Sequence, residues 1–305
     1  MTAGRAIGYR LLGGGFDYLL HLRPAEWPIM AAHTAVGYLL ATGVAGAGNP
    51  AWLGPGLLGL VLWVVCLNGG TLAINSAFDR DEGDVAYLRR PPPPPKGLAT
   101  FSFGLMALGQ IFTFALPLRY AAVYAVCFVL SVLYSVPPIR LKSVAGADWV
   151  INMWGFGTLT PYAGWVATGL GIDPPRGLVL LAFCPLFAAL YPLTQLYQLE
   201  EDRRRGDRTL AVVIGARRSL DAALGGAAVA FALFGAAGVR SGWSFNGGSW
   251  RWPALAVALF TWIRVLVPWR LNAERYRPEE HQRGMYRALA AWAITDIAVL
   301  IAWGL

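Results

Sequence analysis

Charged residues are scarce in this chain. Of its 305 residues, 14% are charged and 56% are hydrophobic, and the mean hydropathy is +0.50. Soluble globular proteins carry about 25% charged residues, so that class is excluded. The apolar residues also form blocks long enough to cross a bilayer, which takes about 20 residues per helix. We therefore expect an all-α polytopic membrane protein, with residues 1–305 forming a single transmembrane domain.

Cysteine and histidine are also rare, with three of each. The cysteines lie inside apolar blocks and form no CxxC pair, which predicts buried, inert thiols. The histidines stand far apart and show no ligand spacing, so a soft-metal site is not expected. His33 lies in an apolar segment, and we expect it to be a hydrogen-bonded residue of helix packing.

Nine apolar segments are predicted to cross the membrane. In the loops between them, 20 lysines and arginines fall on one side and four on the other. The positive-inside rule places the richer side in the cytoplasm, with residues 1–22 as a cytoplasmic N-terminal segment and the C-terminus outside. The expected location is a bacterial or archaeal cell membrane. Because this topology accounts for the net charge of +8, we expect no nucleic-acid partner. The segments are 27–46, 53–78, 98–117, 120–135, 147–169, 177–198, 219–239, 253–269 and 286–304.

Two acidic stretches stand where predicted spans end, at residues 75–84 and 198–202. Carboxylates beside a bilayer are costly and usually functional. In each stretch an amide precedes a carboxylate by four residues, Asn75 before Asp79 and Gln198 before Asp202, so each pair shares one helix face. Hard oxygen donors of this kind suit Mg2+, which takes a few carboxylates together with substrate phosphates and water. Further acids lie close by, at Asp81, Glu82, Asp84, Glu200 and Glu201.

Cations accompany both stretches. Arg140 and Lys142 lie in a loop on the same predicted face, and residues 203–205 are three arginines that follow Asp202 directly. Arginine forks match phosphate oxygens, and metal plus arginine around a diphosphate stabilises it as a leaving group. The positive-inside rule alone also explains these cations, but it does not explain the acids.

A transporter's ion or proton site is an alternative interpretation of the acids. Such sites usually lie near the middle of the bilayer on broken helices, whereas these acids lie at helix ends within reach of water. That position favours a ligand with a water-soluble headgroup and an apolar tail, such as an isoprenyl diphosphate. Its ionisation leaves a carbocation, which aromatic faces stabilise and dry walls protect from water.

The motifs resemble those of the UbiA superfamily of intramembrane prenyltransferases. Asn75-xxx-Asp79 is similar to its first aspartate-rich motif, and residues 200–210 (EEDRRRGDRTL) are similar to its second. Residues 134–142 (YSVPPIRLK) resemble the segment after the fourth helix, and residues 22–27 (LRPAEW) resemble the entry to the first. The resemblance implies a nine-helix bundle around a central cavity open to lipid. It also implies Mg2+-dependent transfer of a polyprenyl group from an isoprenyl diphosphate to a lipophilic acceptor, aromatic or otherwise hydrophobic.

The resemblance also assigns roles by position. Asn75, Asp79 and Asp202 would be catalytic and would hold the Mg2+-diphosphate. Two positions depart from the family pattern, because Gly83 and Gln198 stand where aspartates are usual. We expect Asp84 to substitute at the first and Gln198 to act as a neutral ligand at the second. The predicted metal ligands are Asn75, Asp79, Asp84, Gln198 and Asp202, with Asp81 and Glu201 as further candidates, and the predicted diphosphate-binding residues are Arg140, Lys142, Arg80 and Arg203.

Two further functions stay open. A terpene cyclase of the same superfamily would share the ionisation machinery and fold the prenyl chain onto itself, without an acceptor. A non-catalytic protein that binds or transports lipid would need no metal carboxylate. Membrane lipid is an expected partner in all three cases, and the residues do not distinguish acceptor, prenyl length or oligomeric state.

Overall fold

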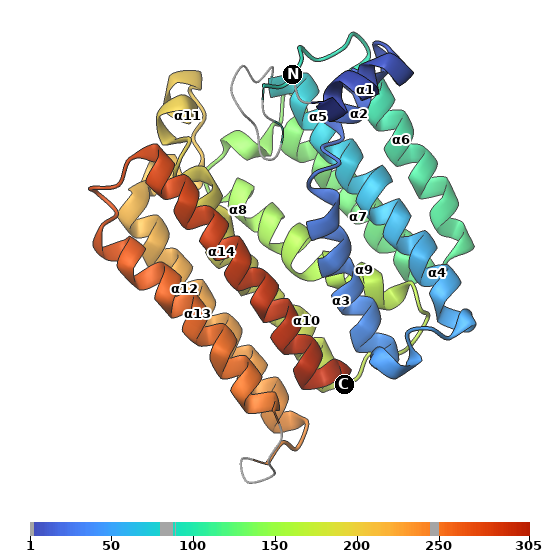
Figure 1. Cartoon of the computed structure of the whole chain (residues 1–305), viewed down its shortest axis with the longest axis vertical. Coiled ribbons are helices and arrows are strands. Elements are labelled where there is room, and N and C mark those ends of the chain that lie inside the picture. Colours follow the sequence, from blue (N-terminus) through green and yellow to red (C-terminus); the bar gives the residue numbers. More distant parts are fainter. Residues whose placement is uncertain (1–2, 80–87, 89, 245–249) are drawn as a thin grey trace.

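The computed structural model describes residues 3–79, 88, 90–244 and 250–305. These residues form a bundle of helices, which confirms the all-α prediction (Figure 1). In chain order the elements are α1 (Ala3–Leu12), α2 (Gly15–His21), α3 (Trp27–Gly46), α4 (Pro50–Val61), η1 (Leu62–Gly69), α5 (Gly70–Asp79), α6 (Leu98–Phe112), η2 (Thr113–Ala115), α7 (Leu118–Ser135), η3 (Leu141–Ser143), α8 (Ala147–Asn152), η4 (Met153–Leu159), α9 (Thr160–Val166), α10 (Pro174–Gln195), α11 (Leu199–Arg205), α12 (Leu210–Arg240), α13 (Arg251–Leu271), α14 (Pro278–Val299) and η5 (Leu300–Gly304).

Within the described part of the chain, eight helices are long and apolar enough to cross a membrane, as expected of an integral membrane protein. By this criterion the predicted count of nine is one too high. The predicted segment 147–169 is helical from Ala147 to Val166, as α8, η4 and α9, but it is not among the eight. This segment buries polar side chains, including Asp148 and Asn152. The eight are Trp27–Gly46, Pro50–Asp79, Leu98–Ala115, Leu118–Ser135, Pro174–Gln195, Leu210–Arg240, Arg251–Leu271 and Pro278–Gly304.

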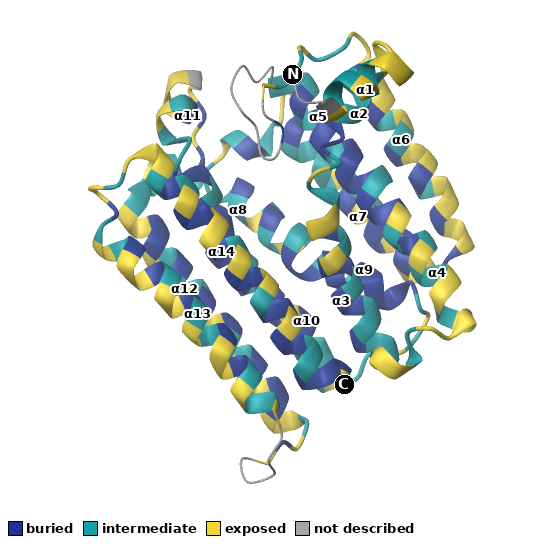
Figure 2. Ribbon diagram, viewed as in Figure 1, coloured by how far each residue is buried: buried dark blue, intermediate teal, exposed yellow. Residues whose placement is uncertain are grey.

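Helix α10 is the central helix of the bundle. In its most apolar stretch 67% of the residues are buried, against 28% in α6 and in α13. It packs mainly on α12 and η4, and exposed residues lie on the outer faces of the surrounding helices (Figure 2). Helix α1 and the end of α5 lie at one end of the bundle together with α11, whereas the C-terminus lies at the opposite end (Figure 1).

Helices α3 and α9 approach each other through glycine. A Cβ atom at Gly37 would overlap the carbonyl oxygen of Pro161, and one at Gly164 would overlap the carbonyl oxygen of Thr34. Small residues permit such close backbone contact between membrane helices, where packing rather than hydrophobic burial drives association. His33 on α3 adds polar links, because its ring contacts Asp296 of α14 and the carbonyl oxygen of Gly157, both at 3.1 Å. The predicted packing role of His33 is therefore confirmed.

Two π-helical segments, η1 and η4, each lie between two α-helices in a continuous helical run. Segment η1 lies within the second span, and η4 lies between α8 and α9. A π-helical turn widens the helix by one residue and is frequent at functional sites. Both segments contribute to the wall of one cavity, η1 through Trp63 and Asn68 and η4 through Phe156.

Candidate active site

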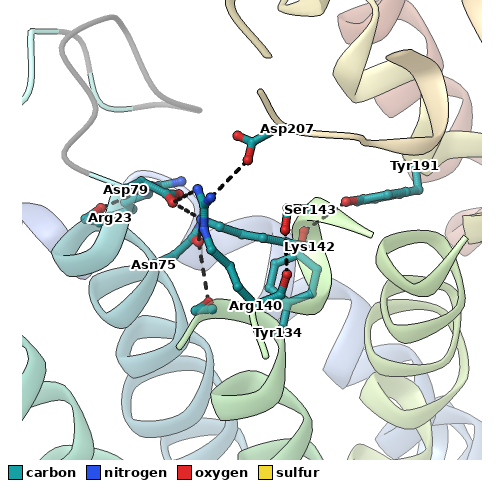
Figure 3. A network of polar contacts seen from close by, with 11 residues as sticks. Arg23, Asn75, Asp79, Tyr134, Arg140, Lys142, Ser143, Tyr191 and Asp207 are labelled. Carbon is teal, nitrogen blue, oxygen red and sulfur yellow. Dashed lines mark hydrogen bonds and ion pairs between the residues drawn. The ribbon is translucent and has the colours of Figure 1, made fainter. Parts of the chain in front are cut away.

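The first predicted motif lies on one face of α5, close to its end. The ammonium group of Lys142 donates hydrogen bonds to Asn75 Oδ1, at 2.6 Å, and to Asp79 Oδ1. Ser135, the last residue of α7, also points its hydroxyl group at Asn75 Oδ1, at 3.4 Å. Amide and carboxylate oxygens one helical turn apart therefore converge on a single cation (Figure 3).

Arg140 connects this motif to a distant loop. One guanidinium nitrogen donates to Asp79 Oδ1 at 3.1 Å, and the other donates to Asp207 Oδ1 at 3.0 Å (Figure 3). The backbone of Arg140 has φ 39° and ψ 58°, a left-handed conformation that is unusual for a residue other than glycine. Hydrogen bonds to Val136 and from Ser143 hold it there. Backbone strain of this kind is concentrated at functional sites.

The four ionic groups are largely shielded from solvent. The side chains of Asp79, Lys142 and Asp207 are 9–10% exposed and that of Arg140 is 29% exposed. Two carboxylates and two cations thus balance in a region of low effective dielectric, where each charge acts more strongly than it does in water.

The donor set has the chemistry that Mg2+ prefers. Asn75 and Asp79 present two hard oxygens to one cation, in the position that the Lys142 ammonium fills. Among the described residues, no three histidine, cysteine, aspartate or glutamate side chains cluster closely enough to hold a metal alone. Two protein oxygens would leave room for the phosphate oxygens and water with which Mg2+ usually completes its shell.

The second motif is arranged differently from the first. Asp202 lies in α11 and is buried, and its Oδ2 accepts a long hydrogen bond of 3.5 Å from the Thr209 hydroxyl. The backbone N–H of Asp207 donates to the Asp202 carbonyl at 3.0 Å. Because the chain turns back after α11, Asp207 rather than Asp202 contacts Arg140. Spacing along one helix did not indicate Asp207, which lies beyond its end.

The buried carboxylate of Asp148 holds the loop between α11 and α12 in place. Its Oδ2 accepts hydrogen bonds from Gln195 Nε2 at 2.8 Å and from the backbone N–H of Leu210 at 3.1 Å. Its Oδ1 accepts from the Gly146 N–H at 2.9 Å. These bonds connect three segments, namely the loop that contains Arg140, the end of α10 and the start of α12. Asp148 was not among the predicted site residues. The feature that could have indicated it is an acid inside a predicted span, which usually has a functional or structural role.

The remaining predicted residues lie around this network. Gln198 is the N-cap of α11, Glu201 is half-buried on α11, and Arg203 is exposed there. Arg80, Asp81 and Asp84 lie outside the described residues, as do Glu82 and Gly83.

Asn75 also lines a cavity of about 300 Å³. Its walls are largely apolar and aromatic, including Phe156 and Phe187, which stack with ring centres 5.3 Å apart. Tyr134 and Tyr191 also line it, and their hydroxyl groups share a hydrogen bond of 2.8 Å. An ionic cluster therefore stands beside an apolar cavity that is large enough for part of a lipid.

The sequence matches the UbiA prenyltransferase family over residues 32–291. The chain belongs to this family. It is therefore a prenyltransferase-family enzyme embedded in the membrane, and its fold follows the family pattern.

Known UbiA-type proteins are similar over most of the chain. A digeranylgeranylglyceryl phosphate synthase from Natronomonas pharaonis is 30% identical over 213 residues, covering 68% of this chain and 73% of the relative. A lycopene elongase/hydratase from Haloferax volcanii is 27% identical over 293 residues, covering 88% and 93%. The structure of a UbiA homologue from Archaeoglobus fulgidus bound to DMAPP and Mg2+ superposes with a TM-score of 0.64 at 19% identity, covering 93% of this chain and 99% of the homologue.

Proposed function

We propose that this UbiA-family protein transfers a polyprenyl group from an isoprenyl diphosphate to a lipophilic acceptor within the membrane, in a reaction that depends on Mg2+. One observation carries the proposal: Asn75 and Asp79 share the ammonium group of Lys142 directly beside an apolar cavity. The cation cluster suits the diphosphate and the cavity suits the prenyl tail. The A. fulgidus homologue bound to DMAPP and Mg2+ supports the same substrate class.

In this proposal, substrate binding rearranges the ion pairs. Lys142 and Arg140 turn from Asp79 to the diphosphate, which leaves the oxygens of Asn75 and Asp79 free to ligate Mg2+. When bound, Mg2+ neutralises charge that develops on the departing diphosphate. Arg140 keeps its second bond to Asp207 and so stays oriented during this exchange. Asp202, the remaining motif carboxylate, would also hold Mg2+, with Gln198 and Glu201 as further candidate ligands.

The prenyl C1–O bond then breaks, and its electron pair leaves with the diphosphate. The allylic carbocation faces the rings of Tyr134 and Tyr191, whose π-systems attract a cation. The apolar walls exclude water, which would otherwise capture the cation as an alcohol. The acceptor attacks C1, and the departed diphosphate takes the proton that the acceptor then loses.

The proposal includes an orientation. The end of α5 that carries Asp79 lies at one end of the bundle together with α1 and α11 (Figure 1), the end that the positive-inside rule assigns to the cytoplasm. The C-terminus at the opposite end would lie outside. We infer that residues 1–305 act as one domain in a bacterial or archaeal cell membrane.

Product analysis with purified protein tests this function. The protein in detergent is incubated with geranylgeranyl diphosphate and Mg2+, with and without a membrane extract that supplies acceptors. Prenyl transfer predicts diphosphate release that requires the extract, together with a product heavier than its acceptor by the prenyl mass. Release without extract that yields a hydrocarbon would identify a cyclase. The absence of release with prenyl chains of several lengths would indicate a non-catalytic lipid-binding protein.

A further inference from the structure

One amide in the cavity wall has no partner. Asn68 lies on η1, is 4% exposed and lines the cavity. Across the described residues, neither its side-chain oxygen nor its nitrogen has a hydrogen-bond partner. Buried side-chain amides in proteins are nearly always hydrogen-bonded. The unpaired donor and acceptor of Asn68 therefore point to a ligand that completes them.

A carboxylate faces the same cavity. Glu26 lies in the turn before α3, and within the described structure its buried Oε2 accepts no hydrogen bond. Burial raises the pKa of Glu26, while the charge of Arg23 acts in the opposite direction. Arg23 directs one guanidinium nitrogen to the Ser76 hydroxyl, at 3.2 Å. The charge of Arg23 thus balances Glu26 in part, and the carboxylate oxygen stays available for hydrogen bonding.

Glu26 and Asn68 line the same cavity. A Cβ at Gly69 would lie 3.5 Å from Leu22 Cβ, so the chain just before the turn that contains Glu26 packs against η1 next to Asn68. Asn68 precedes Asn75 by seven residues, which places it on a similar helix face roughly 10 Å deeper. Asn68 therefore faces the cavity well below Asn75, and Glu26 faces the same cavity from the start of α3.

A prenyl tail offers nothing to either group, because it has no polar atom. One carboxylate and one amide would hold Mg2+ only together with phosphate oxygens, and the proposed function places the diphosphate at Arg140 and Lys142 instead. A hydroxyl group fits both side chains, since its O–H donates to the Glu26 carboxylate and its oxygen accepts from Asn68 Nδ2. A pure hydrocarbon would leave both groups desolvated and unpaired.

We propose that Glu26 and Asn68 bind a hydroxyl group of the acceptor, and that this enzyme selects a hydroxyl-bearing acceptor over a hydrocarbon. This inference rests on the transferase function proposed above and adds the acceptor class. Glu26 and Asn68 are positioning residues for the acceptor and take no part in binding the diphosphate.

The kinetic test compares Asn68→Leu and Glu26→Gln with wild type. The acceptors are geranylgeranylglycerol and 4-hydroxybenzoate as hydroxyl compounds and lycopene as a hydrocarbon. Wild type should prenylate a hydroxyl compound and leave lycopene unchanged. Each variant should raise the KM for that acceptor about tenfold, the loss expected from one hydrogen bond in a dry site, with the KM for geranylgeranyl diphosphate within twofold of wild type. Transfer to lycopene by wild type, or an equal rise in both KM values, would overturn the assignment while leaving the transferase function standing.

A binding measurement tests the proposal without requiring enzymatic activity. Tryptophan fluorescence is titrated with geranylgeraniol and with the matching C20 hydrocarbon that lacks the hydroxyl group. Wild type should bind the alcohol about tenfold more tightly, and Asn68→Leu should abolish that difference. If both probes bind wild type equally, the proposal fails, whether or not the protein transfers prenyl groups.

Thermal unfolding supplies the structural control. Because the side chain of Asn68 has no hydrogen-bond partner among the residues that the structure describes, Asn68→Leu should keep or raise the Tm. Asn152→Leu is the matched control, since Asn152 Nδ2 donates to the Asp148 carbonyl at 2.7 Å and its loss should lower the Tm. An equal fall in both variants would show that Asn68 is structural. Glu26→Gln, which keeps the side-chain shape, preserves the test if Asn68→Leu does not fold.

Discussion

Asp79→Asn is the substitution that tests the ionic cluster while leaving the rest of the fold unchanged. Asp79 accepts hydrogen bonds from both Lys142 and Arg140. The amide keeps one acceptor oxygen but removes the charge. Arg140 retains Asp207 as a partner, whereas Lys142 retains the neutral oxygen of Asn75. The substitution therefore removes the Asp79 carboxylate charge from a largely buried ammonium.

The size of the effect follows from exposure. Breaking a fully buried ion pair costs about 3–5 kcal/mol, and an exposed pair contributes about 0–1 kcal/mol. The Asp79 and Lys142 side chains are each 10% exposed, and Arg140 is 29% exposed. We expect Asp79→Asn to lower the stability of the ligand-free protein by about 1–3 kcal/mol. The rate of diphosphate release should fall at least about 100-fold, because both a metal carboxylate and charge balance are lost.

The matched control is Asp221→Asn on α12. Asp221 is 50% exposed and pairs with Arg270 of α13 at 2.5 Å, away from the cavity. This variant should change stability by less than about 1 kcal/mol and leave release unchanged. Release from geranylgeranyl diphosphate and thermal unfolding in detergent measure the two effects. Release by Asp79→Asn within twofold of wild type, or an equal loss in Asp221→Asn, would refute the assigned role of Asp79.

Three further outcomes are expected. Gly164→Ala should destabilise the protein by about 1–3 kcal/mol and lower its Tm, because the new Cβ would overlap the Thr34 carbonyl oxygen. The control Gly225→Ala, whose Cβ meets open space, should leave the Tm unchanged. Equal melting curves for the two variants would contradict the close contact between α3 and α9. Asp148→Ala should destabilise the protein by about 1–3 kcal/mol. It should also weaken prenyl-diphosphate binding, because it frees the loop that presents Asp207 to Arg140. An unchanged KM for the prenyl diphosphate would show that the Asp148 hydrogen bonds do not affect its binding. Chelation by EDTA should abolish release and added Mg2+ should restore it, and activity that persists in EDTA would exclude a divalent ion.

Local patterns in the sequence predicted local geometry well. The four-residue spacing of Asn75 and Asp79 placed both oxygens on one helix face, and the structure brings both to Lys142. The acidic and basic motifs identified the correct family. These inferences needed only helical periodicity and the chemistry of oxygen ligands.

Contacts between distant segments were not predictable in this way. Arg140 and Asp207 are 67 residues apart, and Gln195 and Asp148 are 47 apart, so no spacing rule joins them. The span count failed for a related reason, because the helical run from Ala147 to Val166 buries polar residues that serve this network. Asn68 lay unnoticed in an apolar run because its lack of a partner is visible only after folding.

The most direct test of the central claim is an experimental structure of the protein with Mg2+ and geranylgeranyl thiolodiphosphate, a substrate analogue that resists ionisation. The account predicts the diphosphate between Arg140 and Lys142, Mg2+ on the oxygens of Asn75 and Asp79, and the prenyl chain in the cavity lined by Phe156 and Phe187. A diphosphate bound away from α5, or a prenyl chain outside this cavity, would contradict it.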